Sequence, residues 1–285
     1  MTERGGELAR VLDGAPSTPR SAMRGDGLPA SVRAELASSA TRYARGLTVA
    51  VSGRAGTGRD TMTRALRQRL RVGALGPGED GTAVAAADLW VHMIVAAPRR
   101  ADHVMLAALP ADRTIVVLGK ADTFADPHIA LEASAAAAHE LARPVVAVSA
   151  LLACADITEV EWTFLADLAA AGEHMPSMSG QFLVGAPGSR ERALRLGLLR
   201  RLDRYGVDTA LELLGDRAVP DAAALNAVMH RLSGIDALVP AFSDRVGIVR
   251  GRREALVRER LDLLAAAGPG RAGIEQLLRV GEVTW

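Results

Sequence analysis

Four short apolar runs rich in β-branched residues recur through the first half of the chain, each bounded by glycine, proline or a charged residue. The segments between them carry apolar residues three and four positions apart, which is the spacing of an amphipathic helix. Short strands alternating with helices are typical of a parallel sheet covered by helices, so the pattern predicts an α/β fold. The strands are expected at 47–53, 88–96, 114–119 and 145–151, and the helices at 31–46, 60–72, 100–109 and 128–142.

The pattern changes after residue 155. Apolar residues then recur at helical spacing, as in ERALRLGLLRRLDRYG, and only FLV at 182–184 could form another strand. The first 28 residues are rich in glycine, proline and serine, which predicts a flexible lead-in. The chain therefore divides into a lead-in (1–28), an α/β domain (29–155) and an all-helical C-terminal region (156–285).

Composition narrows the class of protein. The 285 residues are 49% hydrophobic, enough for a sizeable core, and the net charge of +1 argues against a general nucleic-acid binder. Cys154 is the one cysteine, which favours a reducing compartment and the role of a small buried hydrophobe. Neither a secretory signal nor an apolar run of about 20 residues is found, so the expected location is the cytoplasm.

A glycine-rich turn joins the first expected strand to the next helix. In LTVAVSGRAGTGRDTMTRAL, Gly53 and Gly58 have the spacing of a phosphate-binding loop, G-x-x-x-x-G-K-[ST], and Gly56 lies between them. Glycines let backbone N–H groups converge on a phosphate, and the helix N-terminus adds a favourable dipole. A glycine-rich turn that binds no ligand is the alternative interpretation.

The positions after Gly58 depart from this loop pattern. Arg59 stands where the lysine belongs, and a planar guanidinium is not a conservative replacement for a compact ammonium. Asp60 stands where the Mg²⁺-binding Ser or Thr belongs, followed by Thr61. A carboxylate beside a phosphate is repelled unless Mg²⁺ lies between them, so Asp60 and Thr61 are the candidate Mg²⁺ ligands.

Lys120 is the only lysine in the chain, since every other basic residue of this type is arginine. A lysine at this position, in a chain that otherwise uses arginine, indicates a role that a forked guanidinium cannot fill. It lies in LGKAD, at the carboxyl end of an expected parallel strand, where open α/β sheets bind ligands. Asp122 follows two positions later, and Ser149 and Ala150 come at the end of the next expected strand.

The loop, K-x-D and S-A together resemble P-loop GTPases of the TRAFAC type, whose guanine-recognition elements are N-K-x-D and S-A. The resemblance implies that Asp122 reads guanine, that Lys120 lies along the base, and that Ser149 and Ala150 close the pocket. Gly119 replaces the family's asparagine, which normally ties this element to the phosphate loop. The helix before the first strand and SGIDALVPAFSDRVGIVRGRREAL resemble parts of bacterial dynamin-type GTPases.

The implied fold is a reduced P-loop GTPase-like parallel sheet flanked by helices, and the implied ligand is GTP or GDP with Mg²⁺. Between the phosphate loop and Asp88, however, the family places a switch threonine, a strand and a D-x-x-G element. This chain offers only VGALGPGEDGTAVAA, which is too short for those parts and has no D-x-x-G. Weak or no GTP hydrolysis is therefore expected.

Three functional hypotheses follow. The first is a regulatory or assembly protein that binds guanine nucleotide, weakly or with GDP preferred, and has a degenerate catalytic apparatus. The second is a nucleotide-free pseudo-GTPase scaffold that partners an active GTPase or assembles with itself. The third is an ATP-using P-loop enzyme in which LGKAD is incidental.

Two arginine clusters, at 189–206 and 249–264, could present basic faces to an anionic membrane surface. Acidic residues such as Glu191, Asp203, Glu254 and Glu259 interrupt both clusters. Solvated amphipathic helices are therefore the ordinary interpretation, with peripheral membrane contact as the alternative.

Overall fold

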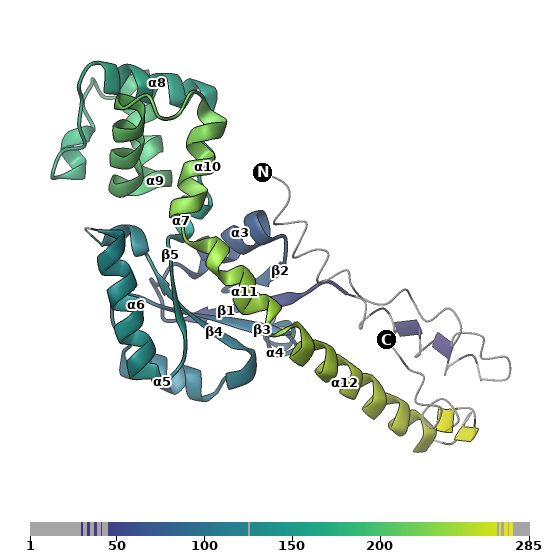
Figure 1. Ribbon diagram of the computed structural model, residues 1–285. Helices are drawn as coiled ribbons and strands as arrows, with labels where there is room; N and C mark the ends of the chain where they lie inside the picture. Colours follow the sequence, from purple (N-terminus) through teal and green to yellow (C-terminus); the bar gives the residue numbers. More distant parts are fainter. Residues whose placement is uncertain are drawn as a thin grey trace. The chain divides into compact units, whose positions relative to one another are not determined.

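A five-stranded sheet lies at the centre of the structure, a computed structural model (Figure 1). The residues described are 30, 33–34, 37–38, 41, 45–124, 126–266, 268, 271–272 and 274–275. The strand order is β2-β1-β3-β4-β5, and β1, β3, β4 and β5 pair in parallel. The strands are β1 (Thr48–Gly53), β2 (Gly73–Leu75), β3 (Leu89–Ile94), β4 (Thr114–Gly119) and β5 (Val145–Val148). The predicted parallel sheet is confirmed.

Strand β2 was not predicted, because three residues between a left-handed Arg71 and a Gly-Pro-Gly turn carry no readable periodicity. The strand lies beside β1 in the sheet, and the Arg67 guanidinium donates to its Ala74 carbonyl oxygen from Nε (2.9 Å) and Nη2 (2.5 Å). Of the three parts for which this segment was expected to be too short, it holds a strand of three residues. The segment still contains no D-x-x-G.

Helices cover the sheet on both faces. On one face, Leu106 of α5 (Arg100–Ala107) and Ala137 of α6 (Pro127–Leu141) pack with Ile94, Val116 and Leu118 of the sheet. Helix α3 (Arg59–Ala65) continues as a π-helical turn, η1 (Leu66–Leu70), and packs against α7 (Ala150–Ala153). The remaining short elements are α4 (Gly81–Ala85) and the 3₁₀ turns η2 (Ala111–Arg113), η3 (Ala121–Thr123), η4 (Ser179–Phe182) and η5 (Ile235–Ala237).

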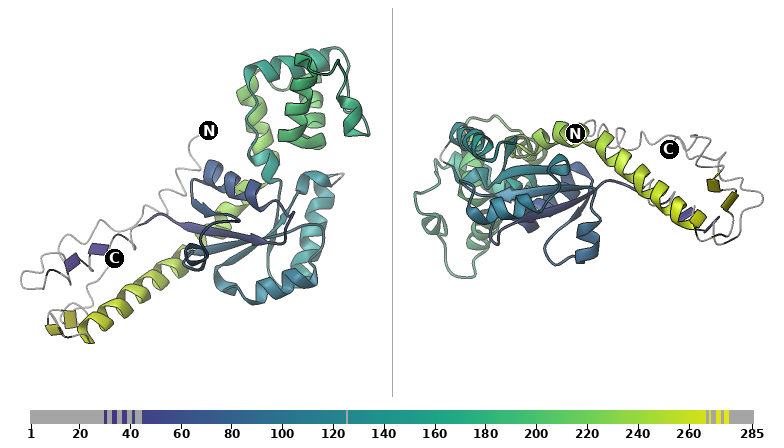
Figure 2. Two further views of the ribbon diagram at one scale, coloured as in Figure 1. Left: turned by 180° about the vertical axis from the view of Figure 1, so that it is seen from behind. Right: turned by 90° about the horizontal axis from the view of Figure 1, so that it is seen from below.

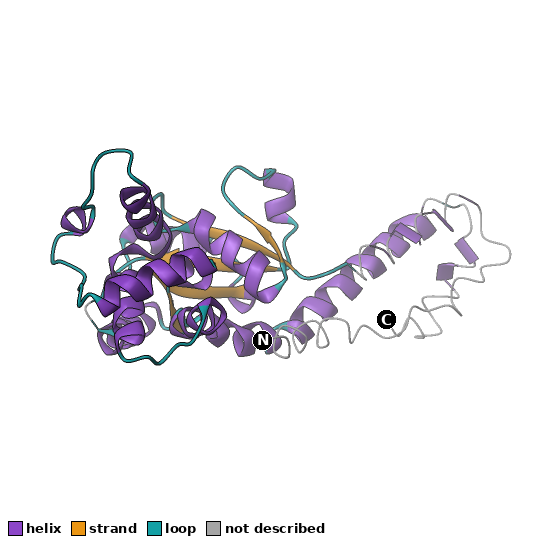
Figure 3. Cartoon of the chain, turned by 90° about the horizontal axis from the view of Figure 1, so that it is seen from above, coloured by secondary structure: helices purple, strands orange, loops and turns teal. Residues whose placement is uncertain are grey.

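After β5 the described chain forms helices and loops and no further strand; the strands, orange in Figure 3, all precede residue 149 in the part of the chain that the structure describes. β5 is shorter than predicted, because Ser149 leaves the strand and caps α7: its Oγ accepts from the Leu152 N–H at 3.2 Å. No strand forms at 182–184, where Phe182 ends η4 as a buried side chain. The α-helices that follow α7 are α8 (Glu159–Ala170), α9 (Arg190–Gly215), α10 (Ala222–Leu232), the short α11 (Leu238–Ser243) and α12 (Val246–Ala266).

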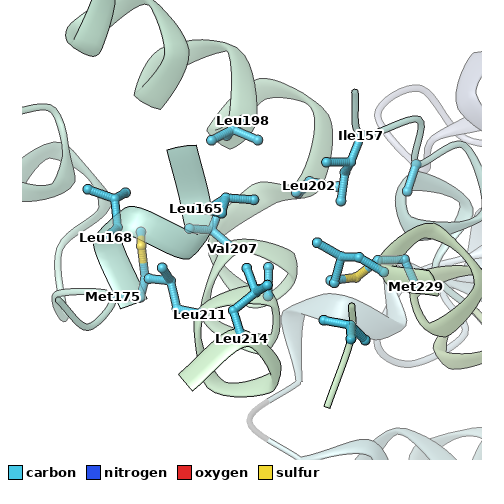
Figure 4. Close-up of a cluster of buried hydrophobic side chains, with 14 of the residues drawn as sticks. Ile157, Leu165, Leu168, Met175, Leu198, Leu202, Val207, Leu211, Leu214 and Met229 are labelled. Atoms are coloured by element: carbon cyan, nitrogen blue, oxygen red, sulfur yellow. The ribbon is translucent and has the colours of Figure 1, made fainter. Parts of the chain in front are cut away.

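Helices α7 to α10 share one hydrophobic cluster, whose side chains point toward one another in Figure 4. It includes residues on both sides of residue 155, such as Leu152 and Ile157. Asn226 of α10 holds the connecting segment: its Oδ1 accepts from the Ile157 N–H (2.8 Å), and its Nδ2 donates to the Ile157 carbonyl (2.9 Å). The helical lobe is thus joined to β5 through α7 (Figures 1 and 2).

Helix α9 is broken at Asp203, whose φ of 56° and ψ of −175° are not helical. A continuous helix over ERALRLGLLRRLDRYG was predicted, so the break is a difference. Leu202 and Gly206 meet across it: a Cβ on Gly206 would lie 2.8 Å from the Leu202 Cβ and 2.9 Å from Leu152 Cδ2. Only a residue without a side chain at 206 allows this close approach.

The described residues form two compact units, one within 49–241 and the other made of those within 2–48 and 242–285. In the second unit, the Arg253 guanidinium donates to the carbonyl oxygens of Arg45 (2.7 Å) and Gly46 (3.1 Å). One face of α12 is buried through Val249, Val257, Leu261 and Ala265. The predicted lead-in and most of the helix predicted at 31–46 lie outside the described residues. Among the helices described, none is both long and apolar enough to cross a membrane.

Candidate functional site

The strand order creates a topological switch point beside β1, where successive connections leave in opposite directions along the sheet. The chain passes from β1 to its neighbour β2 on one side and then crosses to β3 on the other side of β1. Connections leave a switch point in opposite directions, and open parallel sheets bind ligands there, outside the carboxyl ends of the strands. The glycine-rich loop at 53–58 follows β1 directly, so it lies at this point.

The loop is a compact turn that needs its glycines. Gly53, Gly56 and Gly58 have φ values of 137°, 80° and 90°, all in the region that side chains disfavour. A Cβ on Gly53 would lie 2.6 Å from the Met93 carbonyl oxygen. Thr57 closes the turn, because its buried Oγ1 donates to the Arg54 carbonyl at 2.8 Å.

The K-x-D element lies against this loop. A Cβ on Gly119 would be 3.2 Å from the Thr57 carbonyl oxygen and 2.4 Å from the Met93 Cε. The predicted phosphate and base elements therefore meet through backbone at Gly119 and Thr57. The absence of a side chain at 119, where the GTPase family has asparagine, permits the close approach.

We expect Gly119→Ala to lower the free energy of unfolding by about 1–2 kcal/mol, the range for mild overpacking. The nearest obstacle is the mobile end of Met93, so the penalty should shrink when Gly119→Ala is combined with Met93→Ala. Urea unfolding of the two single variants and the double variant measures this coupling. Strictly additive effects would show that the Met93 methyl group is not the obstacle.

Lys120 and Asp122 are available for a ligand. Lys120 is exposed and has left-handed backbone angles (φ 57°, ψ 40°), and its carbonyl accepts from the Thr123 N–H (3.0 Å) and Oγ1 (2.8 Å). Asp122 is half-buried in the resulting 3₁₀ turn, η3. Among the described residues, neither the Lys120 ammonium nor the Asp122 carboxylate has a hydrogen-bond partner.

Ser149 and Ala150 are much less available. The Ser149 side chain caps α7, and its N–H donates to the Ser233 carbonyl at 2.8 Å. Next to it, a Cβ on Gly234 would lie 2.6 Å from the Ala147 carbonyl oxygen, so this turn covers the outer edge of β5. Ala150 is 6% exposed. Its N–H, at the first position of α7, has no partner among the described residues, and the Ser149 hydroxyl only accepts in its cap, so these two donors are left for a ligand.

The first turn of α3 carries the residues that differ from the loop pattern. Arg59 is half-buried and Asp60 is exposed, and neither side chain has a partner among the described residues. Thr61 is half-buried, and its carbonyl oxygen lies 3.7 Å from Cys154 Sγ. Burial raises the pKa of the Cys154 thiol, so it is a protonated packing group and not a nucleophile.

No group of three or more His, Cys, Asp or Glu side chains that could hold a metal ion occurs within the described ranges. Asp60 and Thr61 offer one carboxylate and one hydroxyl, which suits Mg²⁺ only when phosphate oxygens supply further ligands. A metal at this position would therefore bind together with a nucleotide.

A buried polar network beneath the loop was not predicted. Ser52 Oγ lies 3.0 Å from His92 Nδ1, and His92 Nε2 lies 3.6 Å from Asp102 Oδ1. Arg54 Nε donates to both Asp102 oxygens, at 3.0 and 3.1 Å. Burial lowers the pKa of His92, and the Asp102 carboxylate offsets this only in part, so His92 is neutral at pH 7. The signal in the sequence was a histidine inside the apolar strand LWVHMI.

No protein-family model matches the chain, and no curated protein matches it. The functional class therefore depends on the fold and on the geometry of this site.

Proposed function

We propose that the chain is a guanine-nucleotide-binding P-loop protein with a degenerate catalytic apparatus, acting as a regulatory or assembly GTPase-like protein. The observation that carries the proposal is the backbone contact between Gly119 and Thr57. It brings a phosphate-type loop and a K-x-D element together at the switch point of a parallel sheet, which is where such folds bind nucleotides.

The residues expected to contact the base, Lys120 and Asp122, favour guanine as the base that is bound. A carboxylate that accepts from the two N–H groups on the guanine edge must have no competing donor, and among the described residues no group donates to the Asp122 carboxylate. The Lys120 stem can lie along a base, because Lys120 follows β4 directly at the carboxyl end of that strand and has a left-handed backbone there. Phosphates would lie over the loop at 53–58, with Arg59, Asp60 and Thr61 at the helix start.

A second candidate function is a nucleotide-free scaffold that partners an active GTPase or a second copy of itself. It is favoured by the burial of Ala150 and by the Ser149 N–H, which is already used by Ser233. Ser149 is expected to close over the base, but its N–H already donates to another residue of the chain. Such a site binds a ligand less tightly.

Calorimetry with GDP, GTP and ATP separates these functions. We expect weak binding of guanine nucleotides, with dissociation constants of about 1 μM or weaker, GDP at least as tight as GTP, and no binding of ATP. Asp122→Ala should weaken GDP binding by about tenfold, the usual loss for one charge-assisted pair. Asp112→Ala is the matched control, since Asp112 is an exposed carboxylate in η2, at the opposite end of β4.

The alternatives predict different results. No heat with any of the three nucleotides would favour the scaffold. Preference for ATP would refute the role of Asp122 and favour an ATP-using P-loop enzyme.

A further inference from the structure

We infer that Arg54 is the phosphate-binding cation of the loop, in place of Arg59, and that buried Asp102 holds its guanidinium for this purpose. The inference deepens the proposed nucleotide-binding function and rests on it. The ligand class is the di- or triphosphate of a nucleotide.

Asp102 is a fully buried carboxylate, with 0% exposure. Its Oδ2 accepts from the Arg99 N–H at 2.8 Å, and Arg54 Nε donates to both of its oxygens. His92, its other neighbour, is neutral and lies 3.6 Å away. Arg54 is therefore the one cationic side chain that pairs with Asp102 among the residues described.

This pairing uses little of the Arg54 guanidinium. Nε makes the contact with Asp102, and Nη1 and Nη2 have no hydrogen-bond partner within the described chain. Because each Nη carries two N–H groups, four donors stay free for an anion. The Arg54 side chain is 22% exposed, so these donors can be reached from the surface.

The position of Arg54 favours a phosphate. It follows Gly53 directly, inside the loop whose backbone N–H groups would face the ligand. A guanidinium fixed at Nε has already lost most of its rotamer freedom, so less entropy is lost when it binds phosphate. Arg59 has no comparable anchor and must be ordered by the ligand itself.

The network behind Asp102 supports this geometry. Ser52 and His92 are paired residues of β1 and β3, and their side chains meet at 3.0 Å. With Ser52 donating to Nδ1, the His92 Nε2–H faces Asp102. The carboxylate therefore lies between His92 of this strand pair and the start of α5, where the Arg99 N–H donates to it, and it bonds the Arg54 guanidinium.

The test uses Arg54→Gln with Asp102→Asn in the full chain. Arg54→Gln alone would leave a buried carboxylate without its cation and could unfold the domain, whereas the double variant removes both charges. Calorimetry with GDP, GTP and inorganic tripolyphosphate should show a loss of affinity of about tenfold for all three. Arg59→Gln is the comparison variant and should lose less than about threefold, because Arg59 has no anchor, whereas the control Arg200→Gln, at an exposed arginine of α9 outside the loop, should bind like the unmodified chain. Thermal unfolding confirms that each variant is folded.

The possible outcomes distinguish the role of Arg54 from the recognition of guanine. A folded double variant that binds these ligands like the unmodified chain would overturn the inference and leave the pair with a structural role. If the unmodified chain binds tripolyphosphate or ATP without preferring guanine, and the double variant loses that binding, the role of Arg54 stands and guanine recognition falls. If the unmodified chain binds none of the ligands, both proposals fall.

Discussion

GTP turnover by the unmodified chain should not exceed the spontaneous hydrolysis of the nucleotide by a measurable amount in a single-turnover assay. Three parts that stabilise the transferring phosphoryl group are altered or absent: the loop lysine at Arg59, the Mg²⁺-binding hydroxyl at Asp60, and the D-x-x-G with its switch threonine. Catalysis of this reaction is almost all positioning and charge stabilisation, and one lost contact commonly costs about a hundredfold.

The structure gives a physical reason why the segment after β2 does not take the place of the missing D-x-x-G element. Glu79 pairs with Arg67 at 3.0 Å, and Asp80 caps α4 by accepting from Thr82, whose hydrogen bonds lower the pKa of Asp80. A Cβ on Gly76 would lie 2.8 Å from the Thr63 Oγ1, so the loop begins against α3. Both carboxylates of this segment therefore already have partners.

The comparison variant carries Arg59→Lys and Asp60→Ser. We expect it to bind Mg²⁺·GTP about tenfold more tightly, because a threading ammonium and a metal-binding hydroxyl are restored. Its turnover should remain low, since the sequence between the phosphate loop and Asp88 has no D-x-x-G element to help orient the attacking water. Robust hydrolysis by the unmodified chain would show instead that the missing elements come from a partner or from a part of the chain without a recognisable motif.

Arg195→Ala should lower the free energy of unfolding by about 3 kcal/mol, within the range for truncating a large buried, bonded side chain. The Arg195 side chain is only 2% exposed. It donates to Glu173 (2.8 and 2.9 Å), to Glu191 (3.0 Å) and to the Phe182 carbonyl (3.4 Å). Its guanidinium also lies 4.8 Å from the Phe182 ring centre and 5.7 Å from that of Phe164.

Packing and bonding should dominate this loss. The side chains of Glu173 and Glu191 are 39% and 46% exposed, so water can solvate them after Arg195 is removed. What remains is a cavity beside two phenylalanine rings, while the Phe182 carbonyl keeps its hydrogen bond from the Val184 N–H at 2.9 Å. Arg195→Met, which refills part of the cavity, should recover about half of the loss.

Urea unfolding followed by circular dichroism measures these differences. Arg200→Ala is the control, an exposed arginine five residues away on the same helix, and should change stability by less than about 0.5 kcal/mol. Equal effects at positions 195 and 200 would mean that the buried position of Arg195 has no energetic consequence. The same result would support the solvated amphipathic helix that the sequence pattern predicted for this arginine cluster.

The strands that flank the site could be predicted from periodicity alone. LTVAVSG, LWVHMI and TIVVLG are mostly apolar because parallel strands are buried on both faces, and that pattern is local. The glycines at 53, 56 and 58 were recognisable for a similar reason, since positive φ is a local demand on the residue type. Arg195 could not be placed, because burial of a cation depends on partners from other elements.

For the candidate site, the sequence was sufficient to identify the segments: a glycine-rich turn after one strand, K-x-D after another, and S-A after a third. Each of these is a contiguous pattern, and parallel pairing places their ends at one edge of the sheet. Only the tertiary structure decided which groups are free there. Ser233 occupies the Ser149 N–H from 84 residues away, and Asp102 holds Arg54 from another element. Contacts between residues so distant in sequence depend on packing, which no local pattern records.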